Sequence, residues 1–60
     1  MNYTKYRIKI TVWIEDLGER ECTVVAKRYN DDPEYLWWVN DYGLDSVARL
    51  DEHPEAIKLN

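Results

Sequence analysis

Residues 6–14 read Tyr-Arg-Ile-Lys-Ile-Thr-Val-Trp-Ile, and apolar and polar side chains alternate along most of this run. Successive side chains of a β-strand point to opposite faces of the sheet, so this alternation is typical of a strand with one buried face. The β-branched residues Ile, Val and Thr also favour extended backbone. The pattern therefore predicts a half-buried strand whose even-numbered side chains face the core.

A second strand is predicted over Glu21–Lys27, after a turn at residues 16–18, Asp-Leu-Gly. Leu17 would resist the positive φ that a two-residue type I′ turn requires, which favours a three-residue loop with Gly18 in the left-handed conformation. That loop sets the register of the hairpin. It pairs Val12 with Cys22, Ile10 with Val24, and Ile8 with Ala26 on one face. We expect an antiparallel hairpin over about 4–15 and 19–28.

Residues 30–34, Asn-Asp-Asp-Pro-Glu, carry the signals of a helix start. Asp32 can cap the helix, Pro33 suits its first position, and Gly43 can close it. At about 100° per residue, one arc gathers apolar residues toward the hairpin, namely Tyr35, Leu36, Trp38, Val39 and Tyr42. Trp37 falls on the solvent side with Glu34 and Asp41. This spacing predicts one α-helix over about 33–42, packed on one face of the hairpin.

Residues 46–50, Ser-Val-Ala-Arg-Leu, leave two alternatives open. Local propensity favours a short helix, capped by Asp45 or Ser46 and ended before Pro54. A two-stranded hairpin is only marginally stable, however, so a third strand over about 46–50 is favoured, with a further C-terminal strand over 55–59 as an option. The predicted fold class is α+β, in a single domain spanning residues 1–60.

The chain has 60 residues, of which 45% are hydrophobic and 33% charged. A domain of this size buries about 60% of the surface of its unfolded chain, and its core supplies no more than about 3 to 5 kcal/mol of net stability, so association with a partner would stabilise it. One cysteine excludes an internal disulfide, and no apolar run has the length of a membrane span. The N-terminal region also lacks the apolar block of a signal peptide. We expect a cytoplasmic protein that does not enter a membrane.

The net charge of −4 is unevenly distributed. Residues 1–28 hold six basic and four acidic residues, whereas residues 29–60 hold two basic and eight acidic ones. The acidic half would attract a basic partner and repel nucleic-acid phosphate. The simpler alternative is that the acidity only keeps the protein in solution.

Few residues could support catalysis. Cys22 and His53 are the only candidates for a nucleophile and its base, but Cys22 is predicted on the core face, where a thiol is not activated. The doublet Asp31-Asp32 is explained by helix capping, and the run Asp51-Glu52-His53 by a solvated turn. Neither acidic run has the spacing of a calcium loop, and no glycine-rich phosphate-binding turn is present. We therefore predict no enzyme activity, no metal site and no cofactor.

The aromatic residues are three Trp and five Tyr, with no Phe. Trp and Tyr are enriched at protein interfaces because they combine a large apolar body with a polar group. An exposed Trp37 surrounded by carboxylates would be a binding anchor, and Trp13 on the outer face of the hairpin is the second candidate. The predicted partner-binding residues are Trp37, Glu34, Asp41, Trp13, Asp31 and Asp45.

The sequence thus favours a small, acidic, non-enzymatic protein-binding module. It would act as an inhibitor or adaptor that covers a basic site on a partner protein, and one version is a phage or mobile-element inhibitor that mimics the charge of nucleic acid. A structural homo-oligomer, for example a homodimer that buries Trp13, is the first alternative. A nucleic-acid binder is the second, through the basic residues of the outer hairpin face, Lys5, Arg7, Lys9 and Lys27. The overall acidity disfavours a nucleic-acid partner.

Overall fold

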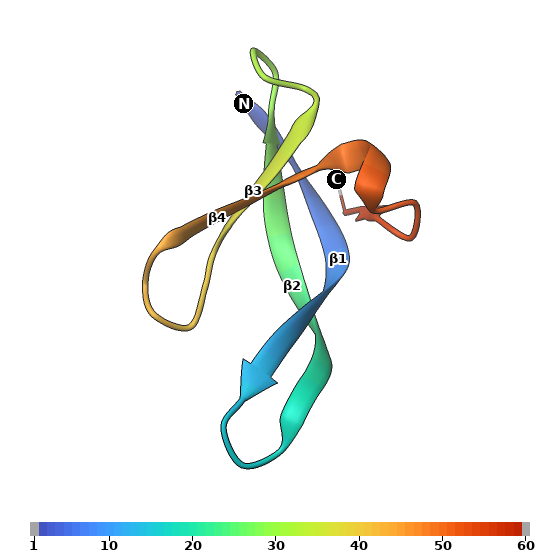
Figure 1. The fold of residues 1–60 in the computed structure, drawn as a ribbon. Coiled ribbons are helices and arrows are strands. Elements are labelled where there is room, and N and C mark those ends of the chain that lie inside the picture. Colours follow the sequence, from blue (N-terminus) through green and yellow to red (C-terminus); the bar gives the residue numbers. More distant parts are fainter. Residues whose placement is uncertain (1, 60) are drawn as a thin grey trace.

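The computed structural model describes residues 2–59 as one antiparallel β-sheet (Figure 1). Its elements are β1 (Tyr3–Ile14), β2 (Gly18–Tyr29), β3 (Tyr35–Val39), β4 (Asp45–Arg49), the 3₁₀ turn η1 (Leu50–Glu52) and β5 (Ile57–Lys58). The strand order is β4-β3-β2-β1-β5, so the end of the chain returns to pair with β1. Residues 2–59 contain no α-helix, and the predicted α+β fold is therefore wrong: the protein is all-β.

Strands β1 and β2 form a long hairpin, but its register lies two residues from the predicted one. Ile8 is opposite Val24 and Ile10 is opposite Cys22. The turn begins one residue earlier than expected, because the Leu17 N–H donates to the Ile14 carbonyl over 3.0 Å. Gly18, at φ 76°, is then the first residue of β2 rather than the last of the loop. A shift of two residues keeps every side chain on its assigned face, so the even-numbered residues still point inward.

Residues 35–39, Tyr-Leu-Trp-Trp-Val, form strand β3 where the sequence predicted a helix. Aromatic and β-branched residues fit a half-buried strand, and the preceding Asp and Pro residues are as typical of a turn as of a helix start. The structure uses them as a turn. The Asp32 N–H donates to the Tyr29 carbonyl over 3.1 Å, and the Tyr35 N–H donates weakly to the Asp32 carbonyl over 3.4 Å.

The turn between β3 and β4 is organised by Asn40. Its side-chain oxygen accepts hydrogen bonds from the backbone of Tyr42 (2.9 Å) and Leu44 (3.1 Å), and its amide donates to the Ser46 hydroxyl over 3.1 Å. Gly43 has a positive φ of 75° and donates its N–H to the Asn40 carbonyl over 3.0 Å. Gly43, predicted to close a helix, therefore closes a hairpin turn. The strand predicted over 46–50 is present as β4.

The core lies on the even-numbered face of the sheet. Ile8, Ala26 and Leu36 are almost completely buried. The residues that pack around them are Tyr6, Ile10, Val24, Trp38, Leu50 and Ala56. Leu50 and Ala56 come from the C-terminal segment, residues 50–56, which follows β4 and covers the core in place of the predicted helix (Figure 1).

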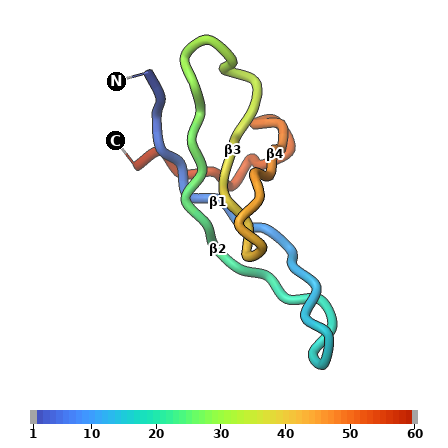
Figure 2. The backbone as a smooth tube through the Cα atoms, turned by 90° about the vertical axis from the view of Figure 1, so that its left-hand side faces the viewer, coloured from blue at the N-terminus to red at the C-terminus, as the bar shows by residue number. Residues whose placement is uncertain are grey.

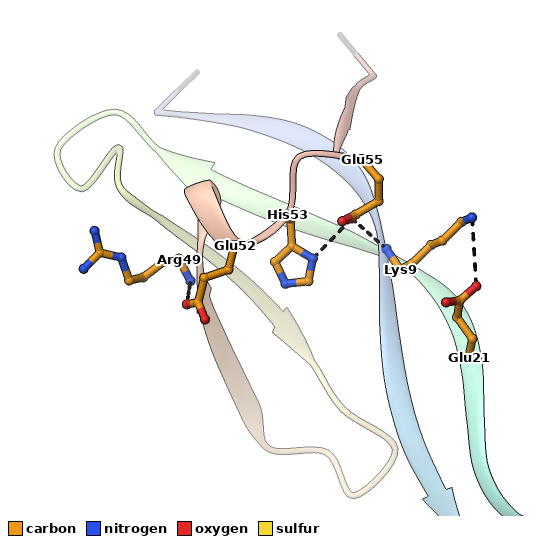
Figure 3. A network of polar contacts seen from close by, with 6 residues as sticks. All are labelled: Lys9, Glu21, Arg49, Glu52, His53 and Glu55. Carbon is orange, nitrogen blue, oxygen red and sulfur yellow. Dashed lines mark hydrogen bonds and ion pairs between the residues drawn. The ribbon is translucent and has the colours of Figure 1, made fainter.

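Hydrogen bonds fix the C-terminal segment to the sheet (Figure 3). The Glu55 carboxylate accepts from the Lys9 backbone over 3.3 Å and contacts Nδ1 of His53 at 3.2 Å. The Leu50 N–H donates to the Glu34 carbonyl over 2.8 Å. Only Ile57 and Lys58 form strand β5, which is shorter than the C-terminal strand considered over 55–59.

The molecule is elongated, with Cα extents of 39 × 23 × 17 Å. The end of the β1–β2 hairpin projects away from the rest of the sheet (Figures 1 and 2). This projection leaves Trp13, Ile14 and Leu17 exposed.

Candidate partner-binding surface

The outer, odd-numbered face of β2, β3 and β4 carries a patch of apolar side chains. Three of these, Val25, Val39 and Val47, are 54%, 64% and 49% exposed, and the fourth, Trp37, is half-buried. The sheet register brings them together, because Trp37 is paired with Lys27 on β2 and with Val47 on β4. We call Val25, Trp37, Val39 and Val47 the outer apolar patch. Contiguous exposed apolar residues rimmed by polar ones mark interaction sites.

Beside this patch lies a hollow of about 450 Å³, which we call the aromatic–acidic hollow. It is lined by two aromatic residues, Tyr29 and Trp37, and three carboxylates, Asp31, Asp32 and Asp45. A second hollow, of about 340 Å³, shares Tyr29, Trp37 and Asp45 with it, and its other lining residues are Val25, Lys27, Trp38 and Val39. Two adjoining hollows therefore share Trp37, the first richer in carboxylates and the second richer in apolar side chains but also lined by Lys27.

The lining residues come from three strands, β2, β3 and β4, and from the turn that precedes β3. Tyr29 ends β2 and stacks edge-on against Tyr3, its partner on β1, with ring centroids 5.8 Å apart. Asp31 and Asp32 lie in the turn that leads to β3, and Asp45 begins β4. Lys27 is directed to the Tyr3 ring, where its ammonium lies 4.8 Å from the centroid. The ammonium of Lys27 is thus already in contact with an aromatic ring of its own chain.

The structure brings together three of the six predicted binding residues: Trp37, Asp31 and Asp45 line one hollow. It does not bring Glu34 and Asp41 to Trp37, and that part of the helical interpretation is wrong. Glu34 lines another hollow with Arg49 and Leu50, whereas Asp41 lies in the β3–β4 turn. An extended chain separates residues that one face of a helix would have gathered.

Trp13 belongs to a different surface. It is 71% exposed and lines a hollow with Val12, Asn40, Asp41 and Tyr42, and this Tyr42 is 86% exposed. Trp13 and Asp41 thus meet near the end of the β1–β2 hairpin. This second aromatic surface has only one carboxylate among its lining residues.

Sequence reasoning missed Tyr29, Asp32 and the three valines of the outer apolar patch. Asp32 was interpreted as a helix cap, which removed it from consideration as a binding residue. The valines and Tyr29 reach Trp37 from β2 and β4, and no periodicity within one segment indicates such pairing. Residues 35–39, Tyr-Leu-Trp-Trp-Val, are all aromatic or apolar and show no alternation, so only the assumption of a strand would have placed Trp37 and Trp38 on opposite faces.

Several charged groups outside the two hollows form local contacts. The pKa of Arg49 is raised by the hydrogen bond and the charge of Asp51, whose carboxylate lies 3.0 Å away. The pKa of Glu55 is lowered: desolvation acts to raise it, but the hydrogen bonds from the Lys9 backbone and His53 outweigh that effect. Lys9 also lies 3.9 Å from Glu21 (Figure 3). The contacts of Glu55 and Asp51 hold the C-terminal segment, whereas the Lys9–Glu21 pair links β1 to β2.

Cys22 and His53 lie in different parts of the fold. Cys22 is a free, half-buried thiol on β2 opposite Ile10, whereas His53 contacts Glu55 in the C-terminal segment. Within residues 2–59, no three His, Cys, Asp or Glu side chains are arranged to hold a metal ion. The same residues include no helix long and apolar enough to span a membrane.

Comparison with known proteins found no matching family model, no similar curated protein and no similar solved structure.

Proposed function

We propose that this protein is a non-catalytic binding module that holds a basic side chain of a partner protein in the aromatic–acidic hollow. The observation that carries the proposal is that Trp37 and Tyr29 line the same hollow as Asp31, Asp32 and Asp45. A guanidinium or ammonium group gains from the face of an aromatic ring and from neighbouring carboxylates at once. Arginine fits best, because its planar group stacks on a ring while it donates in a fork to carboxylates.

The adjoining second hollow, which is richer in apolar side chains, supports a peptide or protein partner over a small cation. Val25, Val39 and Trp37 offer apolar area beside the aromatic–acidic hollow. Interfaces commonly combine an aromatic anchor with a polar rim, and a few such anchors provide most of the binding free energy. A basic residue flanked by an apolar one is therefore the partner chemistry that fits this surface.

Binding of this kind suits an inhibitor or adaptor, which acts by covering a basic site on its partner. We place that action in the cytoplasm. The support for this is that the chain has one cysteine and so no internal disulfide, whereas small secreted domains usually contain several.

The test uses a short oligo-arginine peptide as the probe, with its affinity measured by calorimetry. Trp37→Ala should weaken binding about tenfold, because a desolvated cation–π contact is worth up to about 2 kcal/mol. Trp13→Ala is the matched control, since Trp13 is the more exposed indole and lies outside the hollow. Circular dichroism shows whether each variant keeps its fold.

A second pair of variants tests the charges. Asp31→Asn removes a carboxylate of the hollow and should weaken peptide binding, whereas Asp41→Asn removes one in the β3–β4 turn and should not. Equal losses in folded Trp37→Ala and Trp13→Ala variants, or in both Asp variants, would refute the proposed site.

A further inference from the structure

The free edge of β4 is the second feature with a definite binding geometry. In the strand order β4 is terminal, so one of its edges pairs with no strand of residues 2–59. The β3–β4 ladder is bounded by two backbone hydrogen bonds. The Asn40 N–H donates to the Leu44 carbonyl over 2.8 Å at one end, and the Leu50 N–H donates to the Glu34 carbonyl over 2.8 Å at the other.

These two bonds determine which backbone groups face the free edge. Hydrogen-bonded and non-hydrogen-bonded pairs alternate along an antiparallel ladder. Residues 44, 46, 48 and 50 therefore direct their backbone groups toward β3, and the residues that direct them outward are Asp45, Val47 and Arg49. An exposed row of this kind can accept another strand.

The residues on this edge are complementary to themselves. Strand β4 reads Asp45-Ser46-Val47-Ala48-Arg49, with opposite charges at equal distances from Val47. In an antiparallel pair of two such strands centred on Val47, each Asp45 lies directly opposite Arg49 of the second copy. We propose that β4 pairs in this way with β4 of a second copy, which joins two sheets across a two-fold axis.

Side-chain size and exposure agree with this pairing. Val47 is 49% exposed, and at the axis it would contact the same residue of the second copy, which extends the outer apolar patch across both molecules. On the opposite face Ser46 and Ala48 are small, so the two strands can approach without a clash. Opposite charges on facing cross-strand positions stabilise a pair of strands.

Two local contacts must open when the strands pair. The Arg49 N–H donates to the Glu52 carboxylate over 3.3 Å (Figure 3), and the Arg49 guanidinium contacts Asp51 at 3.0 Å. The Arg49 guanidinium donates two hydrogen bonds to the Asp51 carboxylate, over 3.2 and 3.0 Å, but both side chains are exposed and solvent screens the pair. Pairing of the strands would exchange this local contact for one with Asp45 of the second copy, which keeps the net gain small. A five-residue strand buries less area than a standard interface, which predicts a weak, concentration-dependent dimer.

Sedimentation equilibrium over a wide concentration range tests the proposal. The wild-type protein should shift from monomer to dimer as its concentration rises. Asp45→Lys and Arg49→Asp should each raise the dimer dissociation constant about tenfold or more, since either change places like charges at two symmetric positions. An equimolar mixture of the two variants should recover the dimer, because the lysine introduced at position 45 of one chain then faces the aspartate introduced at position 49 of the other.

The control is Asp41→Lys, which makes the same charge change in the exposed β3–β4 turn and should leave dimerisation unchanged. A wild-type protein that stays monomeric throughout would overturn the proposal. So would single variants that associate as wild type, or a mixture that stays monomeric. Asp45 also lines the aromatic–acidic hollow, but this test involves no basic peptide, so its failure is distinguishable from failure of the proposed function.

Discussion

Replacement of Leu36 and of Val39 by alanine distinguishes the observed strand from a helix over the same residues. A helix would direct both side chains to the core, whereas strand β3 buries Leu36 completely and leaves Val39 64% exposed on the outer face. Leu→Ala substitutions in a core cost about 2 to 5 kcal/mol, from lost burial and from the cavity that remains. Surface substitutions usually stay within about 0.5 kcal/mol.

A domain of this size has a net stability of about 3 to 5 kcal/mol, so Leu36→Ala should be largely unfolded at room temperature. Leu36→Val, with an expected cost of about 1 kcal/mol, keeps the comparison measurable. Urea unfolding followed by tryptophan fluorescence gives the free energy of unfolding of each variant. If Val39→Ala lowers that free energy as much as Leu36→Val does, β3 is not the strand described here.

Three further predictions concern the β3–β4 turn, the C-terminal segment and the electrostatic field of the molecule. Gly43→Ala should lower the free energy of unfolding by about 1 kcal/mol through its left-handed φ alone, because an added Cβ meets no atom within 4 Å, and Gly43→Asn should cost less in the same urea titration. The pKa of Glu55 is lower in the folded protein than in the unfolded chain. The contribution of this carboxylate to stability is therefore present above the unfolded pKa and is lost as the pH falls through the folded pKa. Glu55→Gln should therefore be less stable than wild type at neutral pH, and the difference in thermal midpoint should vanish in acid; a difference independent of pH would contradict this. The association rate of an oligo-arginine peptide, measured by stopped flow, should fall as salt rises, whereas a flat dependence would exclude electrostatic steering.

The hairpin was predictable because its signal lies within single segments. The alternation in residues 6–14 assigns each side chain to a face, and Leu17 and Gly18 indicate a loop of three residues. The exact pairing was not predictable in the same way. A register shifted by two residues buries the same side chains, so burial cannot distinguish the two, and only the position of the turn does.

Residues 30–43 misled sequence analysis because their signals are shared by two structures. Asp32 and Pro33 begin turns as readily as helices, and Gly43 ends either a helix or a hairpin turn. A helix and a strand both direct the side chains of Trp37 and Trp38 away from each other, since adjacent residues differ by about 100° in a helix and by 180° in a strand. The prediction that Trp37 points outward therefore did not depend on the helix. The prediction of which residues surround it did.

The neighbours of Trp37 show where sequence reasoning ends. In a helix they would come from the same segment, at Glu34 and Asp41. In the sheet they come from Tyr29 on β2, from the turn at Asp31, and from Asp45 on β4. These contacts are decided by pairing between strands that are distant in the sequence. The pattern of residues within one segment does not indicate that pairing.

The most direct test of the aromatic–acidic hollow is a nuclear magnetic resonance titration of the ¹⁵N-labelled protein with a short oligo-arginine peptide. We predict that the indole N–H signal of Trp37 and the backbone amides of Asp31 and Asp45 shift with a common saturation curve, while the indole of Trp13 does not move. Shifts centred on Trp13, or equal shifts with an oligo-glutamate peptide, would show that this hollow is not a site for a basic partner.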